Sequence, residues 1–422
     1  MACDPTPSMT SLTPSATTAA WTCPFCALLC EDVGRPAGEP AALATGSCSR
    51  ASASLARLAA ASDDAACRVD GVPTSLDAAL EAGAQRLRRW RQPLFAGLAT
   101  DIAGARAAYR LAARCGAILD HADGATLMHG LRALQDRGQY IATLAELRSR
   151  AEVVVCVGTP GVARFPEFFR RAGLGQPGSP CRRLVFIGAA PAAALPEGVA
   201  VDVMTGGDLF DDVQQLGAHV AGQRVHAPDS GLAALAEQLR ASPYSVLVWE
   251  AGTLPREGAL IVEGLNRIVG TLNRTTRAAS LGLGGSDGGH SVNQTLAWLS
   301  GLPLRTRVAT GAVRHEPHLF DTRRLVDGAG ADGLLWVSSF DPSRLPPAAA
   351  LPRIVLGPPA MAGALLMNDC VFIPVATPGL NAAGHLFRTD GPVVMQVHAA
   401  RDDGLPGVAS VLDSISKRLA RP

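Results

Sequence analysis

The chain of 422 residues contains almost no lysine: Lys417 is the only one, although lysine and arginine together number 38. Outside the last few residues, no lysine is therefore available for a phosphate-binding loop, a Schiff base or general-base catalysis. Aspartate and glutamate together number 37, so the net charge is close to zero. This balance argues against a nucleic-acid partner or an anionic membrane surface.

Long apolar runs are also missing. No run approaches the roughly 20 residues that a membrane-spanning helix needs. Residues 1–20 are rich in Ser, Thr, Pro and Ala and lack the basic and apolar regions of a signal peptide, so we expect a disordered arm. The ten cysteines are then expected to be thiols or metal ligands in a cytoplasmic protein, not a disulfide framework.

From about residue 73 the pattern alternates between helices and short apolar strands, of which Val153–Val157 and Gly333–Ser338 are examples. Continuous apolar strands separated by helices predict an α/β fold with parallel sheets covered on both faces. At this length we expect several subdomains. Ligands of such sheets bind beyond the carboxyl ends of the strands, which here are the loops at Gly158, Gly188, Asp341 and Gly357. The glycine-rich stretch Gly282–Gly289 is expected to be a flexible connection.

The most specific motif is a group of cysteines near the start of the chain: Cys23, Cys26, Cys30 and Cys48. Three thiolates within eight residues and a distant fourth can enclose one [4Fe-4S] cluster. A tetrahedral zinc site uses similar spacing. Because the intervening residues are apolar, buried structural cysteines are the third interpretation.

This cysteine motif resembles the head of the B subunit of formylmethanofuran dehydrogenases, which belong to the molybdopterin oxidoreductase superfamily. The resemblance continues in the same order along nearly the whole chain after residue 20. It includes a stretch ending in Trp298 and a segment that is similar to the C-terminal pterin-binding signature, Gly384–Asp390. It implies a molybdopterin-oxidoreductase-like fold with a small N-terminal cysteine-rich subdomain. The expected ranges are 21–72 for that subdomain, 73–350 for the α/β subdomains, and 351–422 for a C-terminal segment that completes the pterin-type crevice.

In that family the four cysteines hold a [4Fe-4S] cluster beside a tungsten or molybdenum bis-pterin, and a further cysteine or selenocysteine ligates the metal. The matching position here is Ala103, which cannot donate an electron pair. The loop Ala189–Ala194 also lacks donors for a pterin nucleotide. We therefore expect no bound pterin and no catalytic residue. The resemblance leaves a degenerate crevice with four polar candidates: Asp101, Ser339, Asp341 and Arg388.

With these departures, the sequence is similar to the B-like chain of bacterial formyltransferase/hydrolase complexes. Those complexes resemble formylmethanofuran dehydrogenase but hydrolyse the formyl carrier. The resemblance implies a structural chain that holds the A- and C-type subunits together, in a complex with A-, C- and D-type partners that serves tetrahydromethanopterin-linked oxidation of formaldehyde to formate. Two alternatives stay open. One is a catalytic tungsten or molybdenum bis-pterin subunit of formylmethanofuran dehydrogenase, with Asp101 as a conceivable ligand. The other is a free-standing oxidoreductase of the wider superfamily.

Overall fold

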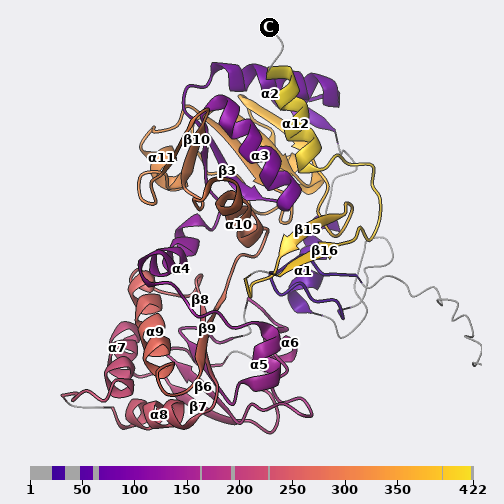
Figure 1. Ribbon diagram of the computed structural model, residues 1–422. Coiled ribbons are helices and arrows are strands. Elements are labelled where there is room, and N and C mark those ends of the chain that lie inside the picture. Colours follow the sequence, from indigo (N-terminus) through magenta and orange to yellow (C-terminus); the bar gives the residue numbers. More distant parts are fainter. Residues whose placement is uncertain are drawn as a thin grey trace, which may run out of the picture.

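The structure is a computed structural model that describes residues 21–33, 48–59, 66–161, 164–191, 195–226, 229–391 and 393–419. The expected arm at residues 1–20 lies outside these ranges, as do residues 192–194 of the alanine-rich loop. The chain forms two stacked α/β bodies (Figure 1). Within the described ranges, every helix falls short of the length and apolar content that crossing a bilayer requires.

The upper body is built on a nine-stranded sheet with the order β11-β10-β4-β3-β12-β13-β14-β1-β2. The five strands from β4 to β14 are parallel, and an antiparallel hairpin extends each edge. The strands are β1 (Cys67–Val69), β2 (Val72–Thr74), β3 (Pro93–Ala99), β4 (Ile118–Leu119), β10 (Thr306–Ala309), β11 (Ala312–His315), β12 (Gly333–Ser338), β13 (Arg353–Gly357) and β14 (Cys370–Pro374). This one sheet therefore contains strands from three of the expected ranges, 21–72, 73–350 and 351–422.

The lower body contains a five-stranded sheet in the order β7-β6-β5-β8-β9, and all its neighbouring strands are parallel. Its strands are β5 (Val153–Val157), β6 (Arg183–Ile187), β7 (Ala200–Met204), β8 (Ser245–Glu250) and β9 (Ala278–Leu283). In sequence this sheet is inserted between β4 and β10 of the upper body. The two sheets confirm the α/β class with parallel strands that the apolar runs predicted.

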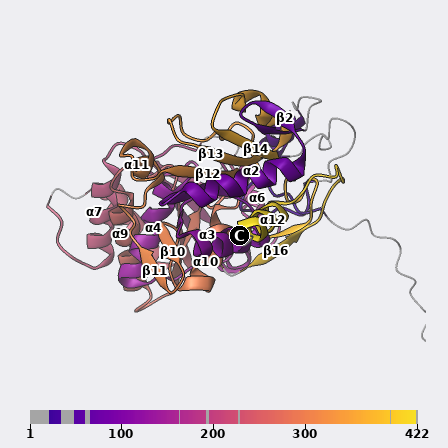
Figure 2. The same ribbon diagram turned by 90° about the horizontal axis from the view of Figure 1, so that it is seen from above.

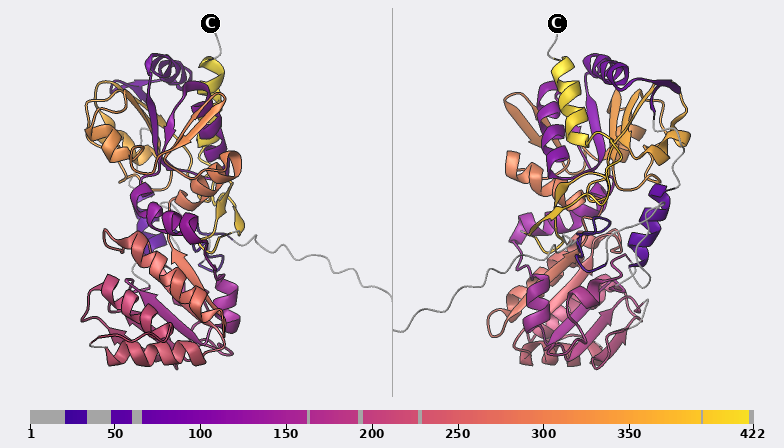
Figure 3. Two further views of the ribbon diagram at one scale, coloured as in Figure 1. Left: turned by 60° about the vertical axis from the view of Figure 1, so that its left-hand side comes forward. Right: turned by 90° about the vertical axis from the view of Figure 1, so that its right-hand side faces the viewer.

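Helices cover both faces of each sheet (Figure 3), and Figure 2 shows the helices of the upper body from above. In β12, Leu335 and Val337 pack toward one apolar cluster while Leu334 and Trp336 pack toward another, which is the alternation of a two-sided strand. Around the upper sheet lie α2 (Leu76–Arg89), α3 (Ile102–Cys115), α10 (Gly289–Ser300) and α12 (Val408–Leu419), with α11 (Thr322–Asp327) and the 3-10 helix η1 (Pro359–Leu365) opposite.

The lower sheet is covered in the same way. On one face lie α7 (Leu209–Val220), α8 (Ser230–Ala241) and α9 (Gly258–Leu272); on the other lie α5 (Leu144–Arg150) and α6 (Phe168–Arg171). The helix α4 (Gly124–Arg137) joins the two bodies, because Met128 belongs to the upper core and Ala133 to the lower. Beside the junction lie α1 (Ser49–Ala59) and the hairpin of β15 (Gly384–Phe387) and β16 (Val394–Val397) (Figure 1).

The glycine-rich stretch Gly282–Gly289 connects the two bodies, as the sequence predicted, but it is packed and not the flexible linker that was expected. It is a close-packed turn that leads from β9 in the lower sheet to α10 on the upper sheet, and residues 286–289 are buried. Gly288 has φ +74°, and a Cβ added there would lie 2.1 Å from the carbonyl oxygen of Thr100. Its glycines thus supply positive φ and close backbone approach, not mobility.

Candidate functional site

The cysteine head comprises residues 21–33 together with Cys48. All four of its motif cysteines are buried, and they belong to the apolar cluster that covers one face of the lower sheet. The backbone folds back on itself, since the amide of Cys23 donates to the carbonyl oxygen of Cys30 at 2.8 Å. The head also contacts the upper body, because the indole of Trp21 donates to the carbonyl oxygen of Gly379 at 2.6 Å. It therefore lies between the two bodies.

The thiols of the head influence one another electrostatically. Burial raises the pKa of Cys23 well above its ordinary value, and negative charge on Cys26, Cys30 or Cys48 would raise it further. Burial likewise raises the pKa of Cys26 to about 11 and that of Cys30 to about 12. Without a bound cation these thiols are neutral at pH 7 and pack as small apolar groups. Among the described residues, no three Cys, His, Asp or Glu side chains are placed to hold a single metal ion.

Two of the four crevice candidates lie at the start of α3 and the end of β12. Asp101 is the N-cap of α3, and its carboxylate accepts a hydrogen bond from the amide of Gly104 at 2.9 Å. The hydroxyl and the amide of Ser339 both donate to the carbonyl oxygen of Ala99, at 2.7 and 2.9 Å. Both side chains are buried and engaged in ordinary helix capping and strand linking.

The position that the family resemblance assigns to a metal ligand is Ala103, in the first turn of α3. Its methyl group is exposed and is not among the residues that line the polar cleft described below. An alanine here offers no donor atom to a metal or to a ligand.

The other two candidates are ion-paired. Arg388 makes a two-point contact with Asp390, at 2.7 Å for each nitrogen–oxygen pair. Asp390 is fully buried and also accepts from the amide of Leu144 at 2.9 Å, so this pair anchors α5. Asp341 pairs with Arg57 at 3.2 Å. Burial alone would raise the pKa of Asp341, but hydrogen bonds from Ser343 and the nearby arginines leave it lowered.

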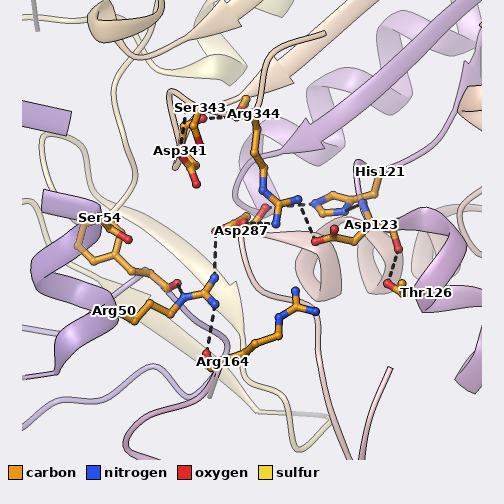
Figure 4. Close-up of polar contacts among 12 residues, drawn as sticks. Arg50, Ser54, His121, Asp123, Thr126, Arg164, Asp287, Asp341, Ser343 and Arg344 are labelled. Carbon is orange, nitrogen blue, oxygen red and sulfur yellow. Dashed lines mark hydrogen bonds and ion pairs between the residues drawn. The ribbon is translucent and has the colours of Figure 1, made fainter. Parts of the chain in front are cut away.

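Asp341 is the only one of the four candidates that lines the polar cleft between the two bodies. This cleft has a volume of about 410 Å³ and is lined by Ser49, Arg50, Ala53, Arg57, Arg164, Pro166, Asp287, Asp341 and Arg344. Two of the expected loops contribute to it, since Arg164 follows β5 and Arg344 follows β12. The close-up view shows Arg50, Arg164 and Arg344 arranged around Asp287 (Figure 4).

Each arginine of the cleft faces a carboxylate. Arg344 contacts Asp123 and Asp287, both at 3.0 Å. Arg50 approaches Asp287 at 3.6 Å. Arg164 pairs with Glu250 at 3.1 Å. Together with Arg57 and Asp341, four arginines therefore meet four carboxylates, of which Asp287 and Asp341 line the cleft and Asp123 and Glu250 lie behind it.

His121 extends this network. Its Nδ1 accepts from the amide of Asp123 at 2.9 Å, and its Nε2 lies 3.3 Å from the carbonyl oxygen of Asp287. Because a carbonyl oxygen can only accept, Nε2 carries the proton and the ring is neutral. Burial lowers the pKa of His121, which agrees with a neutral ring. Burial alone would raise the pKa of Asp123, but the Arg344 guanidinium at 3.0 Å helps to leave it lowered.

The sequence did not single out the arginines of this cleft. The usable signal was positional: Arg164 and Arg344 follow apolar strands that end in the expected binding loops. Their carboxylate partners lie far away in the sequence, so the pairing itself left no local pattern.

No protein-family model matches the chain. The B chain of the formyltransferase/hydrolase complex Fhc from Methylorubrum extorquens is 30% identical over 364 residues, covering 83% of this chain and 97% of that protein. The B chains of tungsten-containing formylmethanofuran dehydrogenase 2 from Methanococcus maripaludis and Methanocaldococcus jannaschii are 22% and 24% identical. They match 73% and 75% of this chain, and 75% and 76% of their own lengths.

Among solved structures, a chain of the formyltransferase/hydrolase complex from Methylorubrum extorquens, crystallised in complex with methylofuran, matches with a TM-score of 0.72. The identity is 28%, and the match covers 84% of this chain and 98% of that chain. The resemblance expected from the sequence is confirmed. The chain belongs to the family of B subunits of formyltransferase/hydrolase complexes, which is related to the B subunits of formylmethanofuran dehydrogenases.

Proposed function

We propose that this chain is the structural, redox-inactive B subunit of a cytoplasmic formyltransferase/hydrolase complex in tetrahydromethanopterin-linked one-carbon metabolism. The observation that supports this most is that all four crevice candidates are committed to internal contacts. Asp101 caps α3, Ser339 bonds to the carbonyl oxygen of Ala99, Arg388 pairs with buried Asp390, and Asp341 pairs with Arg57. With Ala103 at the position of the family's metal ligand, none of these crevice side chains is left to bind and activate a metal-bound pterin.

The partners in this proposal are the A-, C- and D-type subunits. The A-type subunit would carry the metal-dependent hydrolase site, the D-type subunit the formyltransferase site, and the C-type subunit would help to join them. The B chain would hold the A- and C-type subunits together. A near-neutral net charge and the resemblance to a member of a complex support protein partners over nucleic acid.

The rival function is a catalytic tungsten or molybdenum subunit, because two relatives are named as chains of tungsten-containing dehydrogenases. Elemental analysis of the purified complex, combined with oxidative extraction of pterin and its fluorescence, separates the two. We expect only traces of tungsten and molybdenum and no pterin. Stoichiometric metal with an extractable pterin would refute the structural role.

The cysteine head calls for a separate proposal. Four buried thiols in one apolar cluster match a [4Fe-4S] cluster in number and type of donor: Cys23, Cys26, Cys30 and Cys48. A bound cluster would hold these sulfurs as thiolates against the raised pKa values that burial gives Cys23, Cys26 and Cys30. We propose these four residues as the cluster ligands, with a structural use. Iron and acid-labile sulfide assays on anaerobically purified protein decide this, and values near zero would leave the head as apolar packing.

A further inference from the structure

Two of the charge contacts of the cleft converge on one residue of the turn between the two bodies. Asp287 is buried, and its side chain contacts Arg344 at 3.0 Å and Arg50 at 3.6 Å. Its backbone has φ +53°, in the left-handed region, which aspartate tolerates better than most residues but still at some cost. A strained, buried carboxylate between two guanidinium groups persists only where its surroundings hold it.

Arg50 connects Asp287 to the cysteine head and to the lower body. From α1, its Nε donates to the carbonyl oxygen of Phe25 at 2.6 Å, and its Nη1 donates to the carbonyl oxygen of Arg164 at 3.1 Å. Phe25 belongs to the head, and Arg164 follows β5 of the lower sheet. One guanidinium therefore holds three segments that are distant in the sequence, and Figure 4 shows its contacts with Asp287 and Arg164.

Arg344 connects Asp287 to the upper body. It lies in the loop after β12, and its second contact, at 3.0 Å, is with Asp123, which precedes α4. The side chains of Arg50 and Arg344 are only 22% and 24% exposed, and that of Asp287 only 8%. Pairs this sheltered are screened less by salt than surface pairs, and removal of one partner leaves an uncompensated charge.

We propose that Asp123, Arg344, Asp287 and Arg50 form a clamp that fixes the cysteine head and the two bodies in one arrangement. In the clamp, the carboxylate of Asp287 bridges two facing arginines, a role that a bound anion would otherwise play. This inference rests on the proposed function, because it requires a crevice without a charged cofactor. Interfaces between domains of one chain allow relative motion unless specific contacts restrict it, and the clamp supplies those contacts.

Asp287→Asn tests the clamp, because it removes the charge while keeping the size and the tolerance for left-handed φ. Hydrogen–deuterium exchange is measured on the full chain in its purified complex. We expect amides of residues 21–33 and 339–344 to exchange about tenfold faster or more, with β5 unchanged. Glu263→Gln is the control, since it removes a carboxylate that pairs with the exposed Arg137 at 3.1 Å outside the cleft. This control variant should leave amide exchange unchanged in both segments.

Arg344→Gln provides a second, independent variant and should accelerate exchange in the same two segments. Unchanged exchange in residues 21–33 for both variants would overturn the clamp, and so would an equal acceleration in β5, which would indicate general destabilisation. Metal and pterin analysis of the same preparations distinguishes a failure of the proposed structural role from a failure of the clamp. A bound metal-pterin cofactor refutes the structural role, whereas its absence together with unchanged exchange refutes the clamp alone.

Discussion

A charge placed in the middle of the lower sheet should destroy the fold of this chain, and with it the complex. Val155 lies in β5, the central strand of five, and is fully buried among apolar residues that include Ile261 and Val262 of α9. Val155→Asp removes two methyl groups from this cluster and introduces a carboxyl group without a partner. The strand offers no cation or spare hydrogen-bond donor at this depth, since its backbone groups pair with β6 and β8.

The magnitude follows from two contributions. Loss of the buried methyl groups costs about 2 kcal/mol at roughly 0.8 kcal/mol per carbon with some cavity cost. A carboxyl group forced to remain neutral at pH 7 costs about 1.4 kcal/mol for each pH unit above its ordinary pKa near 4, or about 4 kcal/mol. The sum of about 6 kcal/mol is comparable with the roughly 5–15 kcal/mol that stabilises a typical domain. Val155→Ala should lose only about 2 kcal/mol and remain folded.

The assay is purification through a tag on the A-type subunit, followed by measurement of B-chain recovery and of hydrolase and transferase activity per complex. Val203→Asp is the matched control, because Val203 lies in the edge strand β7 of the same sheet and is 47% exposed. We expect Val155→Asp to lose recovery and total activity together, and Val203→Asp to retain both. Wild-type recovery of Val155→Asp would refute the reasoning about buried charge.

The same assay distinguishes a structural role of this chain from a catalytic one. Asp101→Asn keeps a residue that caps helices well, so recovery and activity per complex should stay within a few-fold of wild type. Ser339→Ala loses one buried hydrogen bond, which costs about 1 kcal/mol and leaves turnover unchanged. A fall of several orders of magnitude in activity per complex for Asp101→Asn, with the complex intact, would mean that this chain performs chemistry.

Three further outcomes are expected. Asp390→Ala should lower stability by about 3–5 kcal/mol in thermal or denaturant unfolding, because it leaves Arg388 mostly buried without its partner; Arg388→Ala should cost less, since the carboxylate keeps an amide donor. The pKa of Asp123 is lowered in the folded protein, so its ionised carboxylate stabilises the fold. The wild type should therefore be more stable than Asp123→Asn by the full amount above about pH 5, and this difference should disappear as the pH falls through the lowered pKa. Because the pKa values of Cys26 and Cys30 are about 11 and 12, iodoacetamide should label neither at pH 8 in folded, iron-free protein, and both after unfolding, as mass spectrometry would show.

The interior of the fold could be predicted from the sequence because its strands are continuous apolar runs. Val153–Val157 and Gly333–Ser338 have the predicted bounds. The strand β9 was missed because Ser280 and Gly282 interrupt its apolar pattern. The edge hairpins were missed because strands of three or four residues are too short for a recognisable period. Neither the strand order nor the insertion of the lower sheet between β4 and β10 leaves a local signal.

The site was predictable only in part. The rule that ligand loops follow parallel strands predicted four loops, and two of them, after β5 and β12, supply Arg164 and Arg344 to the cleft. It did not indicate the carboxylates that neutralise these arginines, because Glu250, Asp287 and Asp123 come from other elements. Charge complementarity between distant segments depends on tertiary structure, and composition records only that the totals are nearly equal.

The residues just before α3, next to the position where the family resemblance places a metal ligand, are closely packed by the start of α10 and by β15. A Cβ on Gly288 would lie 2.1 Å from the carbonyl oxygen of Thr100, and one on Gly384 would lie 2.8 Å from the carboxylate of Asp101. Backbone from the turn after β9 and from β15 therefore closes on the two residues that precede α3. A ligand that reached Asp101 would have to displace part of this close packing, which includes the backbone of Thr100 and Gly288.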